Sequence, residues 1–202
     1  MSEYKVTNPA TGKIEASYPT ANEQDIQQAI TKADDAYKEW RNISLSERSA
    51  LLHKIADIYI ERQDELANMI AVEMGKPVAQ GKGELALVAE IYRYYADNAE
   101  QLLAHNQINV AEGSAFVEKL PVGALLGIMP WNYPHYQVAR FAAPNFMAGN
   151  TIILKHAPQC PKTAEVIVEI LKDAGLPDGV YNNVFATNDQ AATIIEDRRL
   201  QG

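Results

Sequence analysis

The residues best suited to chemistry lie in residues 127–134, which read GIMPWNYP. This segment begins where a predicted strand ends, and ligands of open α/β sheets bind beyond the carboxyl ends of the strands. Pro130 and Pro134 restrict the backbone around Asn132, whose side-chain amide could stabilise an oxyanion without adding charge. The alternative is a rigid strand-to-helix turn with packed aromatic side chains, and the residue types alone favour that turn.

A second set of candidates follows the next predicted strand, residues 151–154. Lys155 stands directly after that strand, where a lysine can contact a ribose or a phosphate, and a solvated lysine is at least as good an interpretation. Cys160 precedes a predicted helix, whose dipole lowers the pKa of a thiol. Only His156 in the same proline-rich loop could act as its base, so a packed cysteine is the favoured interpretation.

Several kinds of site are excluded by spacing. The four histidines are scattered and have no zinc-ligand spacing, so no metal is expected. No G-x-G-x-x-G and no G-x-x-x-x-G-K-[ST] follows a predicted strand. Neither the usual dinucleotide fingerprint nor a phosphate-binding loop is therefore present.

Composition excludes further functions. The chain has 18 Lys and Arg against 26 Asp and Glu, a net charge of −8 without a basic cluster, which disfavours nucleic acid and anionic membranes as partners. No apolar run approaches the ~20 residues that span a bilayer. The amino-terminus lacks a signal-peptide pattern, and a single cysteine cannot form an internal disulfide. These features predict a cytoplasmic globular protein.

The candidates must be positioned by a fold, and the sequence pattern changes near residue 110. Turn residues between two short β-like stretches predict a hairpin within residues 5–18. Three amphipathic helices follow, so residues 1–110 are expected to form a hairpin and a helical layer packed on a cofactor domain. The helix boundaries are marked by two capping-box pairs and one terminating pair: Thr20 with Glu23, Ser44 with Glu47, and Gly75 with Pro77.

Strands and helices alternate in the second part of the chain. The expected elements are strands at 122–129, 151–154 and 180–185, and helices at 135–147, 162–174 and 189–197. This alternation predicts βαβ units. The expected fold is therefore α/β, with the helical layer leading into an incomplete doubly wound parallel, Rossmann-like sheet in residues 121–202. Residues 115–120 alternate loosely, as a strand does.

Two stretches together resemble the NAD(P)-dependent aldehyde dehydrogenase superfamily: PWNYP at 130–134 and AGNTIILK at 148–155. NPATG at 8–12, GKP at 75–77 and GLPDGV at 175–180 support the resemblance, because they occur in the family's order and at suitable spacing. The resemblance covers essentially the whole chain, and the combination is highly specific although each piece alone is weak.

The resemblance implies a covalent mechanism in which a cysteine thiolate attacks the aldehyde, hydride passes to the nicotinamide, and glutamate-activated water hydrolyses the thioester. Asn132 would donate its amide hydrogen bond to the thiohemiacetal oxyanion. Cofactor contacts would come from two strand ends, Ile128, Met129, Pro130, Trp131 and Asn132 on one and Lys155, His156, Ala157 and Pro158 on the other. Lining the substrate tunnel would be Tyr133, Tyr136 and Arg140.

Two departures from the family pattern matter. Many NAD-preferring members carry a Glu, which binds the ribose 2′-hydroxyl, where this chain has Pro158, so NADP is slightly favoured over NAD. The loop at 185–188 also lacks glycines that many members have. The resemblance places the nucleophilic cysteine and the general-base glutamate beyond Gly202, and Cys160 does not match the nucleophile's motif. The 202-residue chain is therefore expected to be an amino-terminal fragment that is inactive alone.

Within the family, KHAP at 155–158 and residues 138–144 most resemble the succinate-semialdehyde dehydrogenase branch. Arg140 could bind a substrate carboxylate bidentately, and a structural ion pair on a helix is an equal alternative. The predicted function is NAD(P)-dependent oxidation of a small aldehyde, succinic semialdehyde, by a homodimer or homotetramer with residues 111–120 in an oligomerisation sheet. The rival hypothesis is a non-catalytic truncated chain that acts as an assembly or regulatory partner.

Overall fold

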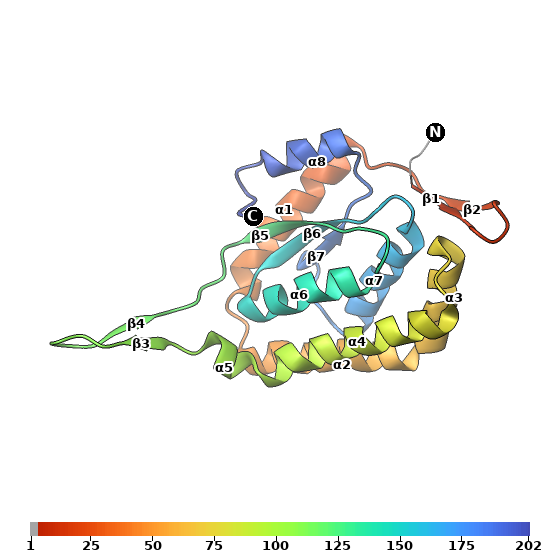
Figure 1. The fold of residues 1–202 in the computed structure, drawn as a ribbon. Helices are drawn as coiled ribbons and strands as arrows, with labels where there is room; N and C mark the ends of the chain where they lie inside the picture. The colour runs from red at the N-terminus through yellow and green to blue at the C-terminus, as the bar shows by residue number, and fades with distance from the viewer. Residues whose placement is uncertain (1–3) are drawn as a thin grey trace.

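A parallel sheet lies at the centre of the computed structural model, which describes residues 4–202 (Figure 1). Its strands β5 (Ala124–Ile128), β6 (Thr151–Lys155) and β7 (Tyr181–Asn183) lie side by side in the order β5-β6-β7. Both pairs are parallel, as predicted, and every residue of β6 is buried. A strand that helices cover on both faces needs such a continuous apolar run.

The other edge of β5 pairs with the end of the chain. Leu200 forms a parallel bridge with Ala124, and the Leu126 amide donates to the Gly202 carbonyl at 2.7 Å. The chain therefore runs outward from β5 to β7 and returns to the opposite side of β5. That reversal makes the carboxyl end of β5 a topological switch point, where doubly wound sheets bind their ligands.

Helices cover both faces of the sheet (Figure 1). On one face lie α1 (Glu23–Trp40) and α8 (Asn188–Ile195), and their apolar residues form one core with the sheet. On the other lie α6 (Tyr136–Ala148) and α7 (Pro161–Asp173). α6, α7 and α8 confirm the predicted alternation, and their bounds differ from the expected ones by one or two residues.

An outer helical layer covers α6 and α7. It consists of α2 (Leu45–Glu61), α3 (Gln63–Met74), α4 (Val78–Asp97) and α5 (Ala99–Leu103). The prediction of three helices before residue 110 is wrong, because the backbone leaves the helical region at Arg62 and again at Asn98. Gly75 ends α3 with a φ of 77°, as its position predicted. Within residues 4–202, no helix is long and apolar enough to cross a membrane.

One of the two predicted capping boxes is correct. Ser44 and Glu47 cap α2 as expected, but α1 is capped by Asn22 with Asp25 rather than by Thr20 with Glu23. The Asn22 side chain accepts from the Asp25 amide at 3.0 Å, and the Asp25 carboxylate accepts in return at 2.9 Å. The Ala21 amide donates to the Phe185 carbonyl at 2.9 Å, which keeps the chain extended until Asn22.

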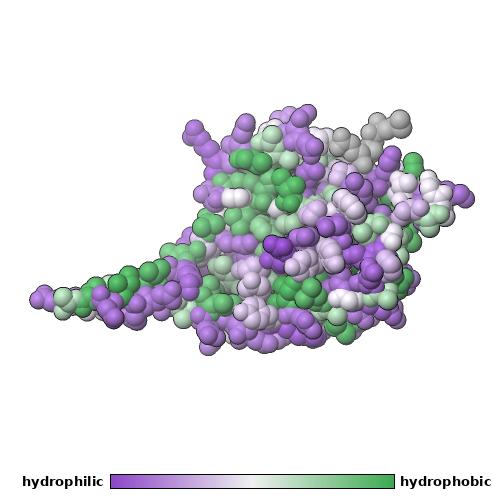
Figure 2. Space-filling model, in the orientation of Figure 1, coloured by the Kyte–Doolittle hydropathy of each residue, from purple (hydrophilic) through white to green (hydrophobic). Residues whose placement is uncertain are grey.

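Two antiparallel ribbons complete the fold. β1 (Lys5–Thr7) pairs with β2 (Ile14–Ser17), as predicted, and β3 (Asn106–Ile108) pairs with β4 (Ala115–Val117). The second ribbon projects from the body as an arm (Figure 1), and apolar residues line one side of it (Figure 2). The exposed apolar residues of this arm are Ile108, Val110, Phe116, Val117 and Leu120.

Candidate functional site

The loop after β5 presents large apolar side chains at the switch point. Ile128, Trp131 and Tyr133 expose 54%, 49% and 46% of their surface, and Asn132 between them is also exposed. The Met129 amide donates to the Lys155 carbonyl at 3.0 Å, which keeps the ends of β5 and β6 together. Ile128, Trp131 and Tyr133 thus form an apolar ledge at the carboxyl end of the sheet, beside the Asn132 amide, which no hydrogen bond within residues 4–202 occupies. Such a surface is suited to hold the flat ring of a ligand.

Lys155 is buried, so its interpretation as a solvated lysine is wrong. It is the last residue of β6, and its Nζ lies 5.8 Å from the centre of the Tyr4 ring. Tyr4 is itself fully buried, and its hydroxyl donates to the Ala186 carbonyl at 2.8 Å. Lys155 therefore lies at the carboxyl edge of the sheet, where the predicted site lies.

His156 fastens the loop after β6 to the loop after β5. Its Nδ1 accepts from the Ala157 amide at 2.8 Å, which assigns the proton to Nε2, and Nε2–H donates to the Pro134 carbonyl at 2.9 Å. Burial lowers the pKa of His156, so the ring is neutral. His156 and Ala157 are buried and Pro158 is partly exposed, so Pro158 is the one of these three predicted cofactor contacts with a surface to offer a ligand.

Cys160 is not a nucleophile in this arrangement. The residue is buried, which confirms the favoured interpretation of a packed cysteine, and burial raises the pKa of its thiol rather than letting the start of α7 lower it. The Sγ–H instead donates to the Trp131 carbonyl at 3.8 Å, which adds a second tie between the two loops.

Two residues that the sequence reasoning missed hold the loop from the inner side. Glu84 of α4 is buried and accepts from the backbone amides of His135 at 2.9 Å and Tyr136 at 3.1 Å, at the start of α6. Lys76 forms an ion pair with Glu84, and its Nζ lies 3.7 Å from the centre of the Tyr133 ring. The sequence did hold a sign that Glu84 is buried, because this charged residue stands beside Leu85 on the apolar side of its helix.

A second buried carboxylate caps the other crossover helix. Glu73 of α3 accepts from the backbone amides of Lys162 at 2.7 Å and Thr163 at 3.0 Å, and from the Thr163 hydroxyl. Protein carboxylates thus occupy the amino-termini of both α6 and α7. In the usual dinucleotide fold the pyrophosphate binds at such a terminus after a glycine-rich turn, so the absence of that turn has a structural reason.

A groove between α4 and α6 adjoins the ledge. It encloses about 520 Å³ and is lined by Leu87, Glu90, Ile91, Tyr94, Tyr95, Tyr136 and Arg140. Tyr136 contacts Tyr133 edge to face at 5.8 Å, so the groove continues from the loop after β5. Arg140 is exposed, with its guanidinium 5.9 Å from the Tyr136 ring, and it forms no ion pair within residues 4–202. The contribution of α4 to this groove was not predicted.

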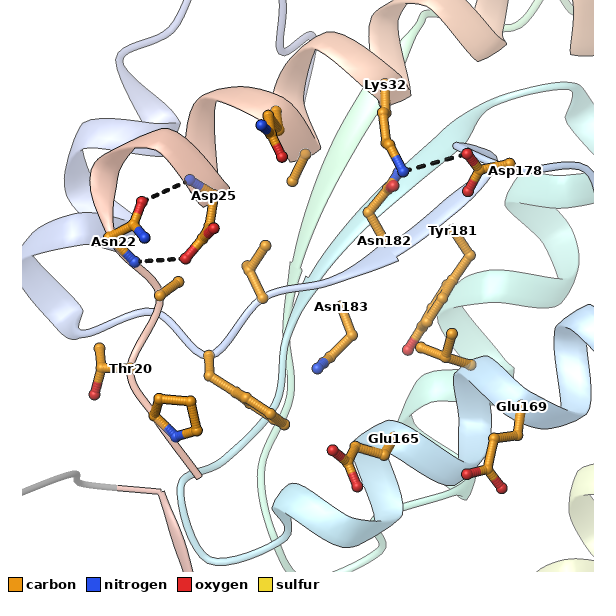
Figure 3. Close-up of a pocket in the computed structure, with 17 residues that line it drawn as sticks. Thr20, Asn22, Asp25, Lys32, Glu165, Glu169, Asp178, Tyr181, Asn182 and Asn183 are labelled. Carbon is orange, nitrogen blue, oxygen red and sulfur yellow. Dashed lines mark hydrogen bonds and ion pairs between the residues drawn. The ribbon is translucent and has the colours of Figure 1, made fainter. Parts of the chain in front are cut away.

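A larger cavity than this groove lies elsewhere, along the outer edge of β7 between α1 and α7 (Figure 3). It encloses about 900 Å³, and Lys32 pairs there with Asp178 at 3.2 Å. Glu165 and Glu169 line its opposite side. None of the sequence-predicted site residues lines it, and two of them, Tyr136 and Arg140, line the groove between α4 and α6 instead.

Comparisons with known proteins match the chain over its whole length. The model of the aldehyde dehydrogenase family matches residues 1–202. A succinate-semialdehyde dehydrogenase (NADP+) of Deinococcus radiodurans is 42% identical over 199 residues, which are 98% of this chain and 42% of that protein. A succinate semialdehyde dehydrogenase (NAD(P)+) of Escherichia coli is 38% identical over 193 residues, 96% of this chain and 42% of that protein.

The structural match is equally extensive. Succinic semialdehyde dehydrogenase from Streptococcus pyogenes, solved in complex with NADP+, superposes with a TM-score of 0.96 and 35% identity over 98% of this chain and 44% of that one. The chain therefore spans less than half the length of each of these three relatives. Since the family model covers every residue from 1 to 202, the chain belongs to the aldehyde dehydrogenase family.

Proposed function

We propose that this chain is the amino-terminal part of an NADP-dependent aldehyde dehydrogenase that oxidises succinic semialdehyde to its carboxylate. The observation that carries the proposal is the exposed Asn132 amide, which no hydrogen bond within residues 4–202 occupies, on a loop at the switch point of a parallel sheet. The names of the relatives support the substrate and the coenzyme. In this proposal the nucleophilic cysteine and the general base come from the part of the enzyme after Gly202.

The residues at the strand ends fit a nicotinamide coenzyme. Ile128 and Trp131 offer an apolar wall to a flat ring, and in the proposal Lys155, at the end of β6, is the cation that meets the ribose. NADP, when bound, supplies the hydride acceptor. Because Glu84 and Glu73 already occupy the amino-termini of α6 and α7, the diphosphate finds no helix amino-terminus there, and its charge must be met by groups outside these two helices.

The Asn132 amide acts on the aldehyde oxygen. Negative charge gathers on that oxygen when a thiolate attacks the carbonyl, and an N–H donor already in place stabilises it without reorganisation. No hydrogen bond within residues 4–202 occupies the Asn132 side chain, so both amide protons are available. Such a donor contributes a factor of about 10²–10³ to kcat.

Coenzyme choice in the proposal depends on Pro158, and substrate choice on Arg140. Pro158 is partly exposed and uncharged, so a 2′-phosphate meets no carboxylate there. The Arg140 guanidinium lies in the groove between α4 and α6 without an ion-pair partner in the described chain, so its N–H groups are available to a substrate carboxylate.

We also propose that the β3–β4 arm packs its exposed apolar side against a second copy of the chain, in a dimer or tetramer.

The experiment that tests the proposal compares two proteins. The whole reading frame that encodes the chain is expressed beside the 202-residue chain alone, and NADPH formation from succinic semialdehyde is followed in both. Turnover only by the longer protein is expected. Turnover by the 202-residue chain that survives Cys160→Ala would contradict the assignment of the nucleophile, and a reading frame that stops at Gly202 would favour the non-catalytic partner.

A further inference from the structure

The inner side of the loop that carries Asn132 is held by a buried ion pair. The Glu84 side chain is fully buried and that of Lys76 is 7% exposed, so water screens neither charge. One carboxylate oxygen of Glu84 accepts from the His135 and Tyr136 amides, and the other pairs with Lys76. Both oxygens are therefore used, and the charge also faces the positive end of the α6 dipole.

Lys76 reaches the loop a second time through its cation–π contact with Tyr133, the residue directly after Asn132. His135, three residues after Asn132, is fixed by Glu84. The ion pair thus anchors the chain at two points just beyond Asn132. On the other side, the thiol of Cys160 holds the Trp131 carbonyl.

The Asn132 side chain itself has no such anchor. It is exposed, and no hydrogen bond from the described chain restrains it, so the described chain positions the amide only through the backbone that carries it. In well-oriented active sites a displacement of about 1 Å can cost on the order of 10²-fold in rate. A residue that sets the backbone after Asn132 therefore acts on the chemistry without touching the substrate.

We propose that Glu84 and Lys76 are positioning residues, which place the Asn132 amide at the developing oxyanion through the start of α6 and the ring of Tyr133. This inference rests on the proposed function. Glu84→Gln keeps the shape of the side chain but turns an N–H₂ group toward either Lys76 or the two backbone amides. Donors then face donors, and the loop has to shift.

The test uses the complete enzyme and a matched control. Glu73→Gln removes an equally buried helix-capping carboxylate, but at α7 rather than at the Asn132 loop. In Glu84→Gln we expect single-turnover NADPH formation to slow by about 10- to 100-fold, with the KM for aldehyde and the Kd for NADP changed less than about threefold. In Glu73→Gln the rate should stay within about twofold.

Coupling to Asn132 separates positioning from general stability. In an Asn132→Ala background, Glu84→Gln should slow the reaction by less than about threefold, because its target is already removed. A merely structural Glu84 predicts that the two effects multiply and that Glu73→Gln is equally damaging, and either result would overturn the proposal. If Glu84→Gln does not fold, Lys76→Met serves instead, with a slowing of about tenfold expected.

A wild-type enzyme that does not turn over succinic semialdehyde would contradict the proposed function but not this inference. The positioning is then read from Trp131 in the 202-residue chain with Trp40→Phe, which leaves one tryptophan. Glu84→Gln should lower the fluorescence anisotropy of Trp131 and raise its quenching by acrylamide, and Glu73→Gln should change neither. Equal values in all three proteins would show that the ion pair does not order the loop.

Discussion

Glu73 permits a test of the buried charges that needs no coenzyme. Its pKa is raised from the ordinary 4.5 to about 7, chiefly because burial disfavours the charged form, while the hydrogen bonds from Thr163 and Lys162 oppose the rise. Since the folded pKa is the higher one, the native state binds more protons between the two values. The stabilisation is therefore complete below about pH 4.5 and is lost as the pH rises through about 7.

The size of the effect follows from the two pKa values. At 1.36 kcal/mol for each pH unit, the interval from 4.5 to about 7 corresponds to about 3 kcal/mol of unfolding free energy. Glu73→Gln keeps the shape and one acceptor but does not titrate. The unfolding free energy of the variant, taken relative to the wild type, should therefore rise by nearly this amount between pH 5 and pH 8.

The assay is urea unfolding of both proteins, followed by circular dichroism at pH 5, 6, 7 and 8. The buried histidines His135 and His156 have lowered pKa values and give the opposite pH dependence, but they contribute equally to both proteins and cancel in the difference. A difference that is flat within about 0.5 kcal/mol, or that falls with pH, would refute the reasoning. It would mean that three hydrogen-bond donors keep Glu73 ionised at neutral pH.

Three further predictions concern the site and its support. In the complete enzyme, Asn132→Ala should lower kcat and kcat/KM together by about 10²–10³ in single-turnover assays, and near-wild-type hydride transfer in an early-melting variant would contradict the oxyanion role. Pro158→Glu should shift the ratio of kcat/KM toward NAD, and a wild type that strictly requires NAD would contradict the role of this position. Arg48 is buried, and its guanidinium donates to backbone carbonyls at the carboxyl ends of α1 and α6. In urea unfolding, Arg48→Met should therefore lower the unfolding free energy by about 3 kcal/mol. The control Arg41→Met, at an exposed residue, should lower it by less than about 0.5 kcal/mol.

Local patterns were enough to predict the parallel sheet. The alternation after residue 122 places each strand and helix close to its observed position, because apolar period and turn residues act over a few neighbours. Ser44 with Glu47 could be read for the same reason. The cap of α1 could not, because two pairs had suitable spacing and a hydrogen bond to the distant Phe185 decides between them.

Burial of single polar residues could not be predicted locally. The flanking sequence of Lys155 suits an exposed site as well as a core, and only the covering elements decide, whereas a packed Cys160 was the favoured interpretation and is confirmed. β3 was missed because Asn106 and Gln107 are poor strand formers, and pairing with β4 outweighs their propensity. The breaks at Arg62 and Asn98 likewise interrupt apolar stripes that continue through them.

The buried glutamates explain why the helical layer belongs to the chemistry of this sheet. In the usual dinucleotide fold, the helix after the first strand offers its amino-terminus to the ligand. Here that terminus is filled by Glu84 from α4, and the next one by Glu73 from α3. The amino-terminus of α6 therefore cannot bind a ligand anion, but its position is fixed by the Glu84 carboxylate. In the proposed function, a fixed start for α6 serves the oxyanion donor at Asn132, because the described chain positions that amide only through the backbone that carries it.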